Sequence, residues 1–322
     1  MKYVGLQSQI SSNNRKSILL LIAFPTLLLG LVWLFFFIFN AYLVNEETTT
    51  FSMDEVNNEF VYSIPFVSIA VTIWFLIAWF SHSAIIQRAT GSKPLERKEN
   101  KRVYNLVENL CISRGMKMPK VYVIEDDSLN AFASGLTDKS FAVTLSRGII
   151  NKLDDDELEA VIAHELVHII NRDVRLLIVS IIFVGIFSFV TEFSFRSLRY
   201  VGRGGSGKKK GNAGAIIIVI LLLGLIGLLL SSLFRFALSR KREYLADAGA
   251  AEMTKNPLAL ASALKKVSKD PWIEAVKRED VAQMFIEHPT KKKDKNSLVS
   301  FFDGMFATHP PIKERIQILE QF

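Results

Sequence analysis

The fold of this 322-residue chain is decided by residues 154–172, which carry the sequence DDDELEAVIAHELVHIINR. Asp154 precedes the apolar run and Glu157 follows three residues later, which is the pairing of a capping box at the start of a helix. Acidic residues in a first turn also favour a helix, because they lie at the positive end of its dipole. We therefore predict a helix over residues 154–172.

Two histidines, His164 and His168, stand four residues apart in this predicted helix. That spacing places both imidazoles on one face, where they can hold one Zn²⁺. Glu165 lies beside them and can take a proton from a water molecule at the metal. The many apolar neighbours indicate a buried helix, and buried paired histidines without a ligand would be costly. The pattern predicts His164 and His168 as zinc ligands and Glu165 as general base.

A catalytic zinc site needs a third protein ligand and an open fourth position. The sequence directly after His168 does not extend the motif, because residues 171–173 are Asn-Arg-Asp. The best candidate lies 75 residues further on, in SRKREYLAD at residues 239–247, where Glu243 and Asp247 share a helix face. We predict a second helix over about residues 234–251. On it, Glu243 ligates the metal and Asp247 accepts the free imidazole N–H of a histidine ligand.

Apolar residues make up 50% of the chain and concentrate in four blocks, with basic residues at the block ends. The first two blocks, residues 18–39 and 61–80, carry no charge, and each can cross about 30 Å of hydrocarbon as a helix. The loop between them holds only acidic charges, whereas the segments outside them are basic. The positive-inside rule therefore predicts two transmembrane helices, with the N-terminus and everything from Arg88 onward starting in the cytoplasm.

The third and fourth blocks form an apolar hairpin over residues 176–234. The third block, residues 176–190, is short for a crossing, whereas the fourth, residues 213–234, is long enough. The loop between them is basic, so two crossings would place it outside, against the positive-inside rule. The hairpin either crosses despite its loop or dips in without crossing. If the helix of residues 154–172 runs on to Leu176, the paired histidines lie about 12 Å from the hairpin.

The remaining segments, residues 92–172 and 235–322, are mixed in character and predict two halves of one soluble domain. Residues 120–125 and 141–145 predict strands within it. The net charge of +7 does not indicate nucleic-acid binding, because the basic residues cluster where lipid headgroups would meet them. Cys111 is the only cysteine and cannot form an internal disulfide. We expect it to be a small buried residue in a helix.

The HExxH pattern with a downstream ExxxD resembles the gluzincin metallopeptidases. Four stretches are similar to the HtpX-type membrane zinc metalloproteases, relatives of the CAAX prenyl endopeptidases: HELVHIINRD at 164–173, SRKREYLAD at 239–247, NAFASG at 130–135, and THPP at 308–311 with ERI at 314–316. The resemblance covers nearly the whole chain. It implies a mainly α membrane protein, in which transmembrane helices accompany a cytoplasmic α+β gluzincin-like metalloprotease domain with a small β-sheet.

The resemblance also implies an activity. The implied protein is an endopeptidase of the cytoplasmic (inner) membrane that holds one Zn²⁺ per chain. Its implied role is to cleave misfolded or damaged membrane proteins in quality control. The implied partners are the lipid bilayer and membrane-protein or peptide substrates. The same metal ligands and base are implied as above. Asn130, Ala131 and Phe132 would lie in an edge strand onto which the substrate adds as a further strand.

Two points stay open at this stage. His309 is either a donor to the oxyanion or transient fourth ligand, or a loop histidine held by Pro310 and Pro311. The activity has two alternatives, a prenyl-protein endopeptidase and a non-catalytic zinc-stabilised membrane scaffold, and an intact Glu165 disfavours the second. We expect residues 1–87 to form an N-terminal membrane region and residues 88–322 a metalloprotease domain that the hairpin interrupts.

Overall fold

The computed structural model describes residues 6–46, 50–201, 208–270, 284–286 and 310–321. The described residues fall into two compact units. The first unit draws on Met1–Arg15, Ser81–Ile178 and Arg235–Phe322, and the second on Lys16–Phe80 and Val179–Phe234. The boundaries fall inside long helices, so that helices α1, α2, α6 and α7 each contribute residues to both units.

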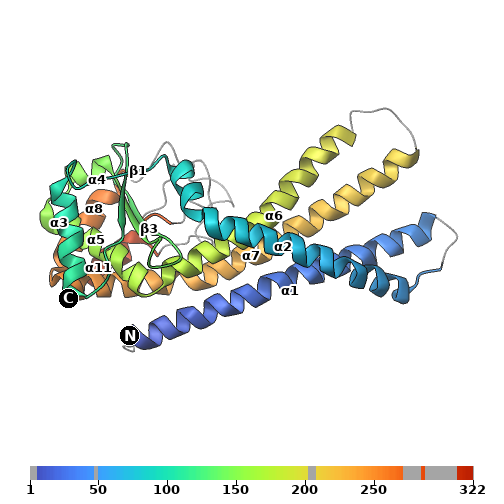
Figure 1. The fold of residues 1–322 in the computed structure, drawn as a ribbon, viewed down its shortest axis with the longest axis horizontal. Coiled ribbons are helices and arrows are strands. Elements are labelled where there is room, and N and C mark those ends of the chain that lie inside the picture. The colour runs from blue at the N-terminus through green and yellow to red at the C-terminus, as the bar shows by residue number, and fades with distance from the viewer. Residues whose placement is uncertain (1–5, 47–49, 202–207, 271–283, 287–309, 322) are drawn as a thin grey trace. The chain divides into compact units, whose positions relative to one another are not determined.

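The second unit consists of segments of four long helices: α1 (Leu6–Glu46), α2 (Met53–Thr90), α6 (Asp173–Val201) and α7 (Lys208–Thr254) (Figure 1). Phe24 of α1 stacks on Phe183 of α6, with ring centroids 4.7 Å apart. The indole N–H of Trp74 in α2 donates to the Ile182 carbonyl of α6 at 3.1 Å. α6 and α7 approach so closely at Gly227 that a Cβ there would lie 2.3 Å from the Phe187 ring. Aromatic packing and close approaches at glycines of α7, at Gly227 and at Gly224 beside Thr191, therefore hold these segments together.

Three helices in the described part of the chain are long and apolar enough to cross a membrane: Ile18–Tyr42, Met53–Thr90 and Asp173–Tyr200. In the most apolar window of α2 no residue is buried, and large side chains such as Phe66, Ile69 and Phe80 are exposed. An apolar surface of this length is unsuited to water and is typical of a helix surrounded by lipid. The predicted apolar helices at 18–39 and 61–80 are thus confirmed.

The helix that contains the third apolar block, residues 176–190, is longer than the block itself. The uncharged run ends before Glu192, but α6 continues to Val201, and Glu192 pairs with Arg196 one turn later along the same helix. An ion pair at this spacing supports a helix rather than ending it. In α7 the apolar stretch with described side chains is shorter, Ile216–Leu230. Whether the hairpin crosses the membrane stays a prediction.

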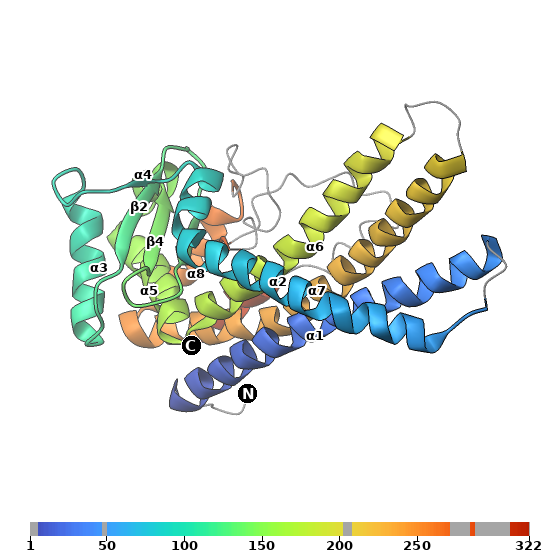
Figure 2. The same cartoon turned by 45° about the vertical axis from the view of Figure 1, so that its right-hand side comes forward.

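The first unit contains a four-stranded sheet of β1 (Lys93–Pro94), β2 (Lys120–Ile124), β3 (Ala131–Ser134) and β4 (Ala142–Ser146). The strand order is β1-β2-β4-β3, in which β2 and β4 are parallel and the other pairs antiparallel (Figure 2). The strands predicted at residues 120–125 and 141–145 are confirmed. Within the described four-stranded sheet, β3 has β4 as its neighbouring strand, with Phe132 opposite Thr144. It therefore forms one edge of the sheet.

Helix α5 (Asp155–Ile170) is the centre of the first unit. It packs against β3 and β4, and against α3 (Lys101–Ser113) and α8 (Pro257–Val267). α4 (Arg147–Lys152) follows β4, and α11 (Ile312–Leu319) packs on α8. The capping box is present: the Glu157 N–H donates to the Asp154 carboxylate at 2.9 Å, and the Asp154 N–H donates to the Glu157 carboxylate at 3.1 Å. The predicted start of α5 is confirmed.

Cys111 is buried in α3, as predicted. Burial raises the pKa of its thiol to about 11, because the thiolate form loses its hydration. The side chain therefore contributes packing, and its thiol is kept in the unreactive, neutral form.

The helix that carries the histidines does not run on to Leu176. α5 ends at Ile170, Asn171 caps it, and Arg172 adopts a left-handed conformation with a φ of 62°. A new helix, α6, then begins at Asp173. A non-glycine residue in this conformation breaks the helical path. The chain therefore changes direction at residues 171–172, directly after the end of α5. As a result Asp173, the first residue of α6, lies beside His168.

Candidate active site

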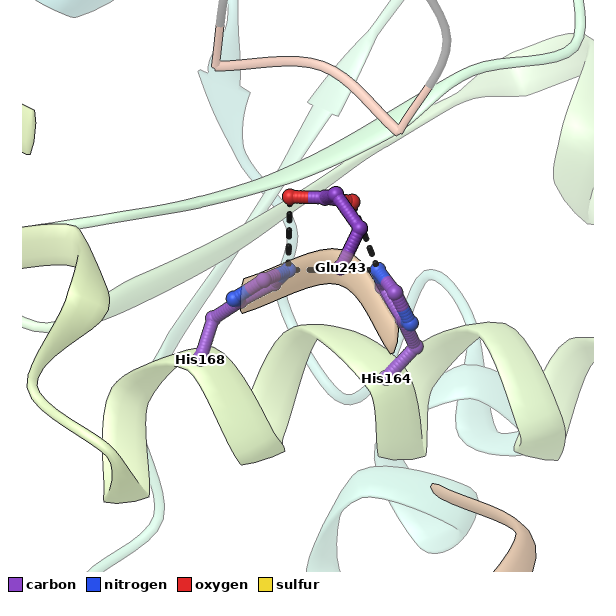
Figure 3. A group of neighbouring side chains, drawn as sticks. All are labelled: His164, His168 and Glu243. Atoms are coloured by element: carbon purple, nitrogen blue, oxygen red, sulfur yellow. Dashed lines mark hydrogen bonds and ion pairs between the residues drawn. The ribbon is translucent and has the colours of Figure 1, made fainter. Parts of the chain in front are cut away.

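His164 and His168 of α5 and Glu243 of α7 bring one potential ligand atom each within 4.8 Å of one another (Figure 3). The two Nε2 atoms lie 3.2 Å apart. The Glu243 carboxylate oxygens lie 3.6 Å from His164 Nε2 and 3.7 Å from His168 Nε2. Ligand atoms bound tetrahedrally to zinc at about 2.0–2.1 Å are about 3.4 Å from each other. The three side chains are therefore close to the arrangement that a zinc ion requires.

Each histidine has a carboxylate at the nitrogen that faces away from Glu243. His164 Nδ1 lies 3.0 Å from Asp247, and His168 Nδ1 lies 3.2 Å from Asp173. Such a carboxylate holds the proton on Nδ1 and leaves Nε2 free to bind a metal. In the structure Asp247 lies beside His164, and its role at a metal stays a prediction. Asp173 was not predicted from the sequence, because the turn at Arg172 that brings it to His168 has no signal in the apolar pattern.

The charges around His164 favour a cation. Burial alone would lower the pKa of this imidazole, but the Asp247 and Glu243 carboxylates raise the pKa to about 9. A position that binds a proton so firmly also attracts a divalent metal ion. The donor set of two imidazoles and one carboxylate suits zinc, whereas calcium and magnesium prefer oxygen ligands throughout.

Arg315 of α11 supports this arrangement from behind. Its fully buried guanidinium donates two hydrogen bonds to Asp247, at 2.7 and 2.8 Å, and lies 3.8 Å from Glu243. Burial would raise the pKa of Asp247, but Arg315 and His164 lower it to about 2. Asp247 is therefore held as a carboxylate. The sequence analysis gave Arg315 no role, since a contact between residues 68 apart has no local signal.

Glu165 is buried beside the three ligand side chains, with 1% of its surface exposed. Burial raises the pKa of its carboxyl group, against the lowering effect of the two histidines. Among the described residues, its Oε1 has no hydrogen-bond partner. This oxygen is available for a proton from water or substrate. Glu165 also lines a cavity together with His168 and Glu243.

The predicted substrate-binding residues lie in or next to β3, the strand that contributes Ala133 to this cavity. Ala131 and Phe132 belong to β3, and Asn130 directly precedes it. The Asn130 carbonyl accepts from Ser146 and so faces β4, whereas the Ala131 carbonyl accepts from Ile286 on the opposite side. Ala133 of β3 lines the cavity with Glu165. The outer edge of β3 thus faces the candidate site. His309 lies outside the described residues.

Paired helical histidines, a distant glutamate and a buried carboxyl group, in a chain with apolar helices of membrane-crossing length, define the class as a membrane metalloprotease. Comparison with known families agrees, since the pattern of Peptidase family M48 matches residues 97–322. The chain belongs to Peptidase family M48.

Several curated proteins resemble the chain over most or all of its length. A "Protease HtpX homolog" of Bacteroides fragilis is 57% identical and covers 100% of both chains. Another, of Listeria monocytogenes, is 34% identical over 98% of this chain and 99% of its own length. Among solved structures, Ste24p of S. mikatae matches with a TM-score of 0.47 and 22% identity, covering 83% of this chain and 60% of that chain.

Proposed function

We propose that this chain is a zinc-dependent endopeptidase of the cytoplasmic membrane that cleaves misfolded or damaged membrane proteins. The observation that carries the proposal is the cluster of His164, His168 and Glu243, with the Glu165 carboxyl group buried beside them. The separations between the ligand atoms suit a tetrahedral zinc ion. The names of the relatives, proteases of the HtpX type, support the same activity.

The chemistry divides between the metal and Glu165. Bound Zn²⁺ supplies a Lewis acid that polarises the scissile carbonyl group. Glu165 takes a proton from the attacking water and passes it to the leaving amine, so that no covalent bond to the enzyme is needed. The raised pKa of Glu165 suits a group that must both accept and release a proton near neutral pH. His309 would assist by donating to the oxyanion.

The substrate in this proposal binds as an extra strand on β3. Asn130, Ala131 and Phe132 are the proposed substrate-binding residues. The Ala131 carbonyl, which points away from β4, would accept a main-chain hydrogen bond of the kind that recognises an extended segment whatever its side chains. The charge pattern around α1 and α2 supports a cytoplasmic location for the N-terminus and the protease domain. The partners are then the lipid bilayer and the exposed loops or peptides of membrane proteins.

The deciding experiment compares the intact chain with Glu165→Gln in proteoliposomes, using an unfolded membrane protein as substrate. Because the proton acceptor is lost while the metal ligands stay, cleavage should fall about 10³-fold or more, with zinc content unchanged by elemental analysis. Glu159→Gln, on the same helix and away from the cavity, is the matched control and should cleave normally. Full activity in Glu165→Gln would instead support a zinc-stabilised scaffold.

A chelator and a choice of substrate complete this test. Removal of zinc should abolish cleavage, and restoring zinc should return it. Comparing a farnesylated peptide with an unmodified peptide of the same sequence separates the proposed activity from a prenyl-protein endopeptidase. Similar cleavage of both peptides is expected, whereas strict dependence on the lipid would contradict the proposal.

A further inference from the structure

Three residues of this chain lie on the outer edge of β3, where the proposed function places the substrate. The Ile286 N–H donates to the Ala131 carbonyl at 2.9 Å. Phe285 forms an antiparallel bridge with Phe132, which is the pairing that an added strand would make. The segment Met284–Ile286 therefore already occupies the edge of the sheet at this point.

The same segment reaches the catalytic groups. Met284, Phe285 and Ile286 line the cavity that Glu165, His168 and Glu243 also line. The volume left in this cavity is about 30 Å³, enough for a water molecule or two and far too small for a peptide. A substrate strand and Met284–Ile286 therefore cannot occupy the site together.

The segment is held through its backbone and through apolar side chains. Besides the bond from Ile286 to Ala131, Arg315 Nη1 donates to the Ile286 carbonyl at 3.3 Å. The Phe285 ring packs edge-on against Phe132, with centroids 4.6 Å apart. All three side chains of the segment are buried. The groove thus binds both main-chain polar groups of one residue, Ile286, and accepts neighbouring apolar residues.

We propose that Met284–Ile286 is an internal competitor, bound in the place of substrate, and that substrate displaces it as an extended segment of consecutive apolar residues. This inference rests on the proposed function, because it takes the edge of β3 as the substrate site. Apolar stretches of this kind are exposed when a membrane protein or a protein core is unfolded. A well-folded protein keeps them covered and cannot displace the competitor.

The test measures peptide binding rather than cleavage. A fluorescent peptide Gln-Met-Phe-Ile-Glu, the sequence of residues 283–287, is titrated into the zinc-loaded full chain carrying Glu165→Gln. Adding Ile286→Pro removes the N–H that bonds to Ala131, so the segment Met284–Ile286 binds the edge of β3 less tightly. Peptide affinity should then rise about fivefold, which corresponds to the free energy of one backbone hydrogen bond. Ile286→Val keeps the N–H and is the matched control, with unchanged affinity.

Three further results would contradict the proposal that Met284–Ile286 is an internal competitor. Unchanged peptide affinity in Ile286→Pro, with an unchanged thermal unfolding midpoint, would overturn the proposal. If Ile286→Pro does not fold, Phe285→Leu, which loses the aromatic contact with Phe132, should raise the affinity about threefold, and no rise would overturn it. A polar peptide, Gln-Asn-Ser-Thr-Glu, should not bind, and equal binding would refute the substrate class. Because binding needs no catalysis, these results are independent of the cleavage test.

Discussion

Helices α2 and α5 are both built largely of apolar residues, but they place those residues in different surroundings. In the most apolar window of α2 none is buried by protein, and the charged residues stand toward its ends, at Asp54, Glu55, Glu59 and Arg88. α5 is buried over most of its length and carries His164 and Glu165 inside the protein. Apolar content alone therefore does not distinguish a lipid-facing helix from a core helix. The position of the polar groups does, because the histidines of α5 lie beside carboxylates of other helices, Asp247 of α7 and Asp173 of α6, whereas the charged residues of α2 stay near its ends.

The largest effect should come from truncating the same residue type in both helices. Ile162→Ala in α5, where the side chain is 0% exposed, should cost about 3 kcal/mol of unfolding free energy through the lost apolar contact and the cavity left behind. Ile69→Ala in α2, where the side chain is 59% exposed, should change it by less than about 0.5 kcal/mol. Denaturant unfolding of the detergent-solubilised protein measures both. Equal costs would mean that protein covers α2.

An arginine substituted for an exposed apolar residue should show whether that position faces lipid or water. Ile69→Arg lies near the middle of the predicted span and should reduce membrane insertion, at a cost of about 2.5 kcal/mol. Ile112→Arg in α3 replaces an isoleucine of the first unit that is 72% exposed and should be neutral, since Arg is well hydrated there. A membrane-insertion reporter quantifies the first and thermal unfolding the second. Normal insertion of Ile69→Arg would argue against a lipid-facing α2.

A smaller effect should follow from replacing the guanidinium group of Arg315. Arg315→Lys keeps the charge but cannot donate both hydrogen bonds to Asp247, so His164 is held less firmly. Zinc affinity should fall about tenfold, measured by competition with a chelator. Arg97→Lys, on an exposed ion pair with Glu108, is the matched control and should leave zinc affinity unchanged. An unchanged affinity in Arg315→Lys would remove α11 from the support of the site.

The smallest effect should come from the start of α5. Asp154→Ala removes the carboxylate that accepts from the Glu157 N–H and should cost about 1 kcal/mol of unfolding free energy. Asp156→Ala, two residues into the same turn and outside the capping box, should cost only a few tenths. Denaturant unfolding compares the two variants. If both cost the same, the acidic charge of the turn, rather than the cap, sets the start of α5.

The parts of the fold that the sequence predicted are those that depend on the spacing of residues within one helix or strand. Four-residue spacing placed His164 with His168 and Glu243 with Asp247, and the capping box placed the start of α5. The strands β2 and β4 followed from short runs of β-branched residues. Apolar block lengths gave α1 and α2, but they failed for α6, since a block ends at its first charge and a helix need not.

The parts that the sequence did not predict depend on contacts between distant segments. Asp173 reaches His168 only because Arg172 turns the chain. Arg315 reaches Asp247 from another helix, and Phe285 pairs with Phe132 through a segment of three residues that is too short for any periodicity. Such contacts are fixed by tertiary packing, which local patterns do not record.

The salt bridge between Asp247 and Arg315 has a consequence for how the protein is made. During translation the two histidines are synthesised first, Glu243 and Asp247 next, and α11 with Arg315 last. Until that helix has been synthesised and docked, the Asp247 carboxylate has no guanidinium to hold it, and the His164 ring behind it is not fixed. Partly translated copies therefore lack the contact that holds the Asp247 carboxylate, and this part of the site is completed only when α11 packs.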